Sequence, residues 1–238
     1  GGSTHVVHFS VGAVVNGDDA VDGGDAVNAD ELLRRGDLAM YSAKSAGGSR
    51  VALYEDDFSH QAVRRLKLEQ ELYRALESDE LIPAFQPIVS LRTGQIIGAE
   101  ALARWRQPGT GALAPGEFIP LAEETGQIRQ LDRQIAERAV ARCAELLCDR
   151  KREFYLSINV SAKTIDAQYI GYLAELIERY AIPPERLTIE LTESAVVGES
   201  GRLQQLLIDL RSLGVKVAID DFGTGYSSLA YLQNLPAD

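Results

Sequence analysis

The sequence predicts an α/β protein whose larger part, residues 81–238, folds as an incomplete TIM-like (β/α) barrel. Two observations predict this fold. From residue 154 onward, short apolar runs alternate with longer amphipathic segments, and three successive strand-to-helix units favour parallel strands. Four apolar runs also end in carboxylate or amide side chains, which parallel strands would bring together at one rim of a barrel.

The bulk composition is that of a globular protein. The chain has 238 residues, of which 45% are hydrophobic and 25% are charged. Its net charge of −11 argues against binding to nucleic acid polymers or anionic membranes. The sequence has no apolar stretch of about 18 residues and no N-terminal signal pattern. We therefore expect a cytoplasmic chain, and a membrane tether in a longer parent protein stays open.

Residues 1–55 predict a small α+β segment. Residues 6–15 are rich in β-branched side chains, and a loop rich in glycine and aspartate follows. A helix is expected near residues 29–45, with Asn28 as its cap and a glycine pair after its end. Residues 50–54 predict a closing strand, and residues 56–80 predict a linker helix from their helical spacing of apolar side chains.

From residue 81 onward the elements alternate. A turn at 92–94 makes the first two strands, residues 85–91 and 95–105, a hairpin. One or two helices, interrupted near Thr125-Gly126, are expected within residues 118–147. The remaining expected elements are strand 154–160, helix 167–180, strand 187–191, helix 201–213, strand 215–220 and helix 227–234. Five strands are thus predicted where a complete barrel has about eight.

The acidic strand ends predict a metal site. Glu100, Asn159, Glu190 and the pair Asp220-Asp221 each follow an apolar run. Carboxylates gathered in one place repel one another unless cations neutralise them. Ligands that offer only oxygen favour hard cations, so Mg²⁺ or Mn²⁺ is expected rather than zinc.

Residues 81–238 resemble the EAL family of cyclic di-GMP phosphodiesterases. Five motifs carry the resemblance in the family's order: Phe85-Gln86-Pro87, Glu100-Ala101-Leu102, Ile158-Asn159-Val160-Ser161, Glu190-Leu191-Thr192-Glu193 and Asp220-Asp221-Phe222-Gly223. The resemblance implies metal-dependent hydrolysis of cyclic di-GMP to linear pGpG in bacterial second-messenger signalling. The chain would then be a C-terminally truncated EAL domain.

Residues 1–55 resemble the C-terminal part of a GGDEF diguanylate cyclase domain. The resemblance rests on residues 10–12, 29–41 and 43–44. The hairpin that names this family would precede residue 1, and Gly48 stands where the family usually has a phosphate-contacting arginine. We therefore expect no cyclase activity from this segment. The predicted domains are residues 1–55, the linker helix 56–80 and the EAL domain 81–238.

The EAL resemblance also implies a role for each site residue. Glu100, Asn159, Glu190 and Asp220 would bind the first metal, and Asp221 would help bind the second, so that Glu100, Asp220 and Asp221 form the catalytic group. Arg104 would contact a substrate phosphate through its guanidinium group. The remaining implied roles are substrate binding by Gln86, Leu102 and Thr192, and anchoring of the loop 223–229 by Glu193.

The resemblance places a further lysine, aspartate and glutamate of the family after Asp238. We therefore expect this chain alone to be weakly active or inactive and its parent protein to be active. A non-catalytic sensor of cyclic di-GMP, or a dimerisation module, is the alternative. Sensors of this kind typically lose metal ligands. The ligands expected within this chain are present, which favours an enzyme over a sensor for the parent protein. The parent is expected to be a homodimer through the EAL domain, with an upstream sensory domain.

Overall fold

A computed structural model describes residues 9–15, 29–45, 48–54, 57–107, 111–149, 151, 153–192 and 202–220. The chain divides into two compact units, residues 1–70 and 71–238. The helix predicted at 227–234 and the residues Glu193 and Asp221 lie outside the described part of the chain.

The first unit contains two short parallel strands and a helix. Strand β1 (Val11–Ala13) pairs with β2 (Val51–Leu53), and α1 (Ala29–Ser45) packs on them. A Cβ atom on Gly12 would lie 2.1 Å from the carbonyl oxygen of Gly36, so only glycine allows α1 to approach β1 this closely. The helix spans the predicted residues, and β2 is shorter than the strand predicted at 50–54. Strand β1 lies within the predicted β-rich stretch, of which residues 6–8 fall outside the described part of the chain.

The predicted linker helix is present as α2 (Asp57–Leu76), which begins in the first unit and ends in the second. Its last turns are fixed by burial, because Leu72, Ala75 and Leu76 are at most 2% exposed. Among the described residues, no helix combines the length and apolar character needed to cross a membrane.

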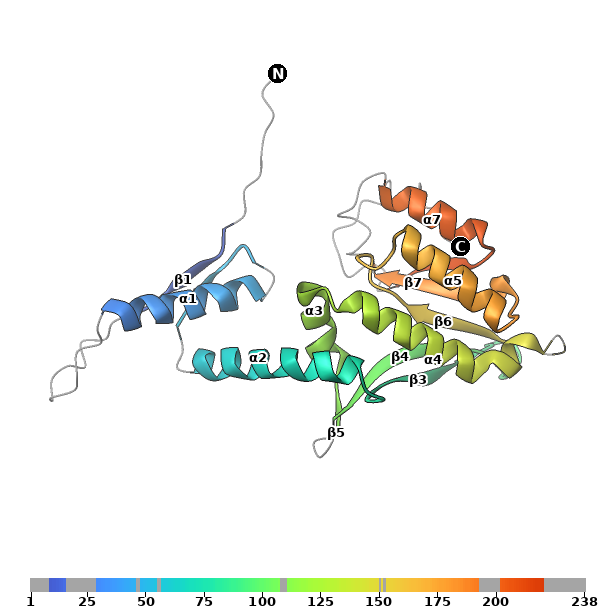
Figure 1. Cartoon of the computed structure of the whole chain (residues 1–238), viewed down its shortest axis with the longest axis horizontal. Coiled ribbons are helices and arrows are strands. Elements are labelled where there is room, and N and C mark those ends of the chain that lie inside the picture. The colour runs from blue at the N-terminus through green and yellow to red at the C-terminus, as the bar shows by residue number, and fades with distance from the viewer. Residues whose placement is uncertain are drawn as a thin grey trace, which may run out of the picture. The chain divides into compact units, whose positions relative to one another are not determined.

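The second unit is built on a mixed sheet (Figure 1). Strand β3 (Leu81–Val89) and β4 (Ile96–Gln107) form the predicted antiparallel hairpin, and β3 begins four residues earlier than predicted. Strands β6 (Tyr155–Asn159), β7 (Leu187–Thr192) and β8 (Lys216–Asp220) follow in parallel, as predicted. The sheet order is β3-β4-β6-β7-β8, and within the described residues the sheet does not close.

One strand was not predicted. Strand β5 (Gly111–Leu113) pairs antiparallel with the end of β4, with Trp105 opposite Leu113. Its sequence of glycine, alanine and leucine lacks the β-branched residues that indicate a strand. This pairing lengthens β4 well beyond the acidic motif that it carries.

Helices pack along the sheet and enclose the core (Figure 1). They are α3 (Pro115–Thr125), α4 (Ile128–Cys148), α5 (Ala167–Arg179), the short 3₁₀ helix η1 (Pro184–Arg186) and α7 (Arg202–Ser212). The predicted interruption between α3 and α4 falls at Gly126, whose φ of 79° lies in the left-handed region. Helix α5 begins where the Asp166 side chain accepts a hydrogen bond from the Tyr169 amide, 2.9 Å away.

The core of this unit lies between the parallel strands and helices α4, α5 and α7. Its hydrophobic cluster includes the fully buried side chains of Leu156, Ile158, Ile189 and Val217 from the strands. Burial of each such side chain contributes roughly 1.5–3 kcal/mol to folding. This packing fixes the parallel strands in register, and the register decides which polar side chains meet.

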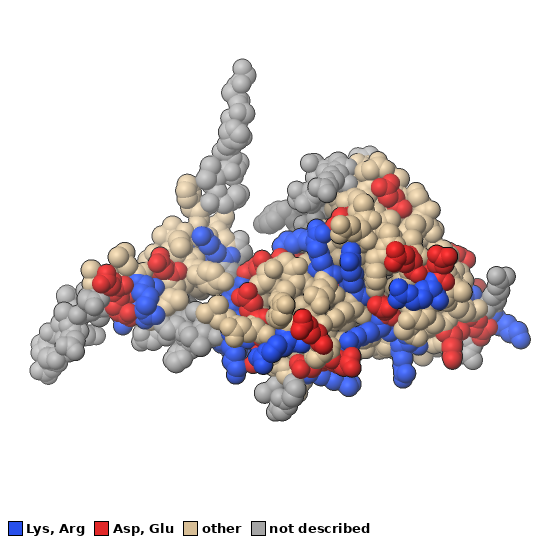
Figure 2. All heavy atoms as spheres, in the orientation of Figure 1, with Lys and Arg blue, Asp and Glu red and all other residues tan. Residues whose placement is uncertain are grey.

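The surface carries charges of both signs. In Figure 2, acidic and basic side chains of the described residues are interspersed. Some of them are paired, as where Arg179 Nη1 lies 2.6 Å from Glu137 Oε1.

Candidate metal centre and adjoining pocket

The strand register brings the acidic motifs together. Asn159 of β6 stands opposite Glu190 of β7, and Thr192 of β7 stands opposite Asp220 of β8. Glu100 of β4 stands opposite Ser157 of β6. Asn159 and Asp220 end their strands as expected, and Glu190 lies near the end of β7. Glu100 instead lies inside β4, because that strand continues through its pairing with β3 and β5.

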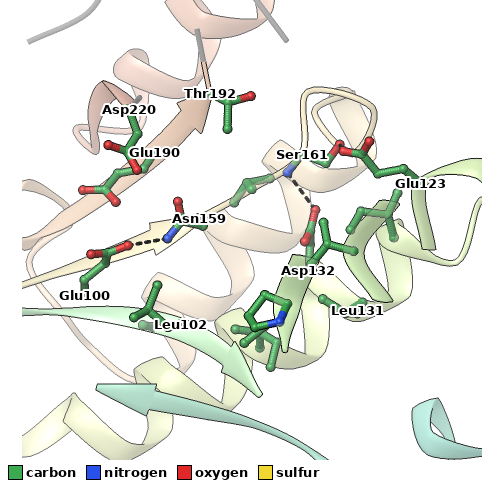
Figure 3. Close-up of a pocket in the computed structure, with 17 residues that line it drawn as sticks. Glu100, Leu102, Glu123, Leu131, Asp132, Asn159, Ser161, Glu190, Thr192 and Asp220 are labelled. Carbon is green, nitrogen blue, oxygen red and sulfur yellow. Dashed lines mark hydrogen bonds between the residues drawn. The ribbon is translucent and has the colours of Figure 1, made fainter. Parts of the chain in front are cut away.

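Three carboxylates form the centre of the site. One oxygen from each of Glu100, Glu190 and Asp220 lies within 4.8 Å of the other two. The Asn159 side-chain amide donates a hydrogen bond of 2.7 Å to Glu100 Oε1 (Figure 3). We call these four residues the acid cluster.

The charges of the acid cluster act on one another. Burial raises the pKa of the Glu190 carboxyl, the neighbouring charges of Glu100 and Asp220 raise it further, and a hydrogen bond with Ser157 opposes the rise. A divalent cation would relieve this repulsion, and the cluster offers it only carboxylate and amide oxygens. The donor set therefore fits a hard cation such as Mg²⁺ or Mn²⁺.

A pocket of about 280 Å³ opens beside the acid cluster (Figure 3). Its lining includes all four cluster residues and apolar side chains of α3 and α4, such as Ile119 and Leu131. A wall of this composition with a few polar groups is typical of a small-molecule site. The pocket is therefore suited to a ligand with an apolar ring, and an anionic group on that ligand would need a bound cation to offset the charge of the acid cluster.

The predicted substrate-binding residues lie in different places. Leu102 and Thr192 line the pocket. Gln86 stands opposite Glu100 in the β3–β4 hairpin, is exposed, and does not line it. Arg104 is half-buried and also lies outside the lining, and its Nη1 donates to the Ala103 carbonyl oxygen at 2.8 Å.

Sequence reasoning missed a second polar group in the pocket wall. Asp132 of α4 is only 4% exposed, and its carboxylate accepts a 3.0 Å hydrogen bond from the Ser161 amide. The Ser161 hydroxyl donates at 2.7 Å to Glu123 Oε1 of α3. A signal was present, because Asp132 interrupts the apolar face that Ile128, Leu131 and Ile135 form on α4.

Burial raises the pKa of Asp132 from 3.8 to about 7, and the nearby Glu123 charge adds to the rise. The hydrogen bond from the Ser161 amide opposes it. Below pH 4 the carboxyl is protonated in the folded and unfolded states alike. As the pH rises through 7, the folded state must hold a buried charge, so the stabilising contribution present at low pH is lost.

This titration makes a testable prediction for Asp132→Asn. The variant avoids the buried charge, so its stability relative to the wild type should rise between pH 4 and pH 8, by at most about 4 kcal/mol. Thermal unfolding at both pH values in EDTA measures the difference. The exposed Glu175→Gln serves as the control and should show no such change. A difference that is equal at both pH values would contradict the assigned pKa.

The comparisons with known proteins agree with this geometry. A family model described as EAL domain matches residues 69–238. Among curated relatives, an uncharacterised protein of Mycobacterium tuberculosis is 40% identical over 210 residues, which cover 87% of this chain and 34% of that protein. The bifunctional diguanylate cyclase/cyclic di-GMP phosphodiesterase MucR of Pseudomonas aeruginosa is 36% identical over 215 residues, covering 90% of this chain and 31% of MucR.

A solved structure is also similar. The PaMucR phosphodiesterase in complex with c-di-GMP matches with a TM-score of 0.67 and 36% identity, over 72% of this chain and 70% of that one. The present chain spans about a third of the length of the curated relatives described above.

Proposed function

Because this chain belongs to the EAL domain family, we propose that it supplies the phosphodiesterase site with which its parent protein hydrolyses cyclic di-GMP to linear pGpG. The observation that carries the proposal is the acid cluster at the edge of a pocket with an apolar wall. That arrangement supports metal-dependent hydrolysis of a phosphodiester whose base or sugar packs against the wall.

Each cluster residue has a proposed part in metal binding. Glu100, Asn159, Glu190 and Asp220 would hold the first Mg²⁺ or Mn²⁺, with Asp221 helping to hold a second. Such a metal pair lowers the pKa of a bound water and stabilises charge on the phosphate oxygens. Hydrolysis forms a bond from the water oxygen to phosphorus and breaks the bond from phosphorus to a ribose 3′ oxygen.

Other residues would bind and orient the substrate. Leu102 and Thr192 are proposed to contact the dinucleotide from the pocket wall, and Gln86 from the neighbouring strand. Arg104 follows Glu100 and Leu102 at alternate positions of β4, so its side chain belongs on the same face of the strand. We propose that its guanidinium group contacts a phosphate, and that Glu193 anchors the loop 223–229.

We further propose the surrounding organisation. Residues 1–55 would be part of a GGDEF-like domain, and residues 56–80 would link it to the EAL domain of residues 81–238. The parent protein would be a cytoplasmic homodimer formed through its EAL domain and controlled by an upstream sensory domain. The arrangement of β1, α1 and β2, in the order expected from the sequence, supports the first part of this proposal.

The test is hydrolysis of cyclic di-GMP by the parent protein, with the product identified by chromatography. Mg²⁺ or Mn²⁺ should support formation of pGpG, and EDTA should abolish it. Binding of cyclic di-GMP without hydrolysis in either metal would instead favour the sensor. If the protein neither binds nor hydrolyses the dinucleotide, the dimerisation module is the better account.

A further inference from the structure

The chain is held by hydrogen bonds immediately after it leaves the acid cluster. Strand β6 ends at Asn159, and the next amide, that of Val160, donates to the Glu190 carbonyl oxygen at 3.0 Å. The amide after that, of Ser161, donates to Asp132 Oδ2 at 3.0 Å. Two consecutive peptide groups are therefore fixed, one by β7 and one by a side chain of α4.

Asp132 is an unusual residue for its position. It lies on the buried face of α4, where an apolar side chain would pack without the desolvation cost of a carboxyl group. Figure 3 shows its carboxylate directed at the Ser161 amide, on the side of the pocket across from the acids. The desolvation cost of burying Asp132 is explained if the hydrogen bond that it accepts helps to hold the site together.

Ser161 lies two residues after Asn159, so the hydrogen bond to its amide restrains the backbone next to a residue of the acid cluster. The direction of the backbone at Asn159 decides where its side-chain amide points, and that amide lies 2.7 Å from Glu100 Oε1. Glu123 restrains Ser161 further, because its carboxylate accepts a hydrogen bond of 2.7 Å from the Ser161 hydroxyl. Binding sites need their groups held to within roughly 0.5 Å, and outer partners of metal ligands supply this precision.

We propose that Asp132 is a positioning residue: by accepting from the Ser161 amide it holds Asn159 in contact with Glu100 and so sets the geometry of the acid cluster. The placement of Asn159 is a property of the metal-free chain, whereas its consequence for metal binding rests on the function proposed above. Asp132 itself contacts neither metal nor substrate in this account.

The test compares three variants of the buried face of α4. Asp132→Leu fills the site with a larger apolar side chain and removes the acceptor, whereas the isosteric Asp132→Asn keeps an acceptor oxygen. Cys143→Ala is the matched control, since Cys143 is 5% exposed on the same helix and does not line the pocket. Leucine is chosen over alanine because it leaves no cavity, so the protein should still fold.

Two readouts distinguish the inference from the proposed function. In metal-free protein, the NMR signals of the Asn159 side-chain amide should change in Asp132→Leu and stay near their wild-type positions in Asp132→Asn and Cys143→Ala. With Mn²⁺, calorimetry should give a 10- to 100-fold loss of affinity for Asp132→Leu and less than about threefold for the other two. If Asp132→Leu and Cys143→Ala lose similar thermal stability, a difference between them in the Asn159 signals and in Mn²⁺ affinity supports the positioning role, because lost stability does not account for it.

The inference is overturned if the Asn159 amide signals in Asp132→Leu match those of the wild type. It is equally overturned if Asp132→Asn changes them as much as Asp132→Leu does, because the acceptor oxygen would then not be what matters. Failure of the wild type to bind Mn²⁺ would contradict the proposed function alone, since the metal-free comparison does not depend on it.

Discussion

Glu100→Ala is expected to reduce hydrolysis of cyclic di-GMP by the parent protein by more than about 100-fold. Loss of an outer partner of a metal ligand typically costs 10- to 100-fold, and the loss of a ligand itself should cost more. The substitution also removes the acceptor for the Asn159 amide. Folding should change little, because Glu100 is only partly buried and its removal relieves repulsion on Glu190.

The measurement is the initial rate of pGpG formation in saturating Mg²⁺ or Mn²⁺, for the wild type and the variant. Glu175→Ala is the matched control, since it removes the same charge from an exposed position on α5 outside the pocket. Its rate should equal that of the wild type. Nearly equal rates for Glu100→Ala would mean that the acid cluster is not the catalytic site.

Glu190→Gln is expected to have opposite effects on metal affinity and on metal-free stability. Glu190 belongs to a group of three carboxylates whose oxygens lie within 4.8 Å of one another, and its neighbours disfavour its charge. Removing that charge should stabilise the metal-free protein while weakening metal binding. A cation that binds only the folded state stabilises it by an amount that grows with the logarithm of its affinity, so the metal-induced rise in Tm should shrink in the variant.

Thermal unfolding in EDTA and in a series of Mn²⁺ concentrations measures both effects. The wild type should unfold at a lower temperature than Glu190→Gln in EDTA and gain more from Mn²⁺. Thr192→Val, which changes a pocket residue of the same strand without changing charge, is the control and should keep the wild-type Mn²⁺ response. An unchanged Mn²⁺ response in Glu190→Gln would remove Glu190 from the metal site.

Periodicity and turn residues predicted most elements of the fold. The hairpin, the break at Gly126 and the alternation after residue 154 all follow from short-range patterns, and the structure contains each of them. Strand β5 was missed because three small or apolar residues carry no strand signal. Barrel closure remains a prediction, since the described strands form an open sheet.

The acid cluster was predictable in its members but not in its geometry. Each acid follows an apolar run, which the sequence displays, but the pairing of Asn159 with Glu190 depends on register and hence on packing between distant helices and strands. Asp132 was missed for a related reason. Its partner, Ser161, lies 29 residues away along the chain, and an acid on an apolar helix face gives no indication of what it contacts.

The central claim is that Glu100, Glu190 and Asp220 bind the catalytic cation together. The most direct test is anomalous scattering from crystals of the protein grown with Mn²⁺, because the signal locates the ion without reference to activity. This account predicts a peak within coordination distance of carboxylate oxygens from all three residues, and loss of that peak in Glu100→Ala. A Mn²⁺ peak bound elsewhere, in a protein that hydrolyses cyclic di-GMP, would contradict it.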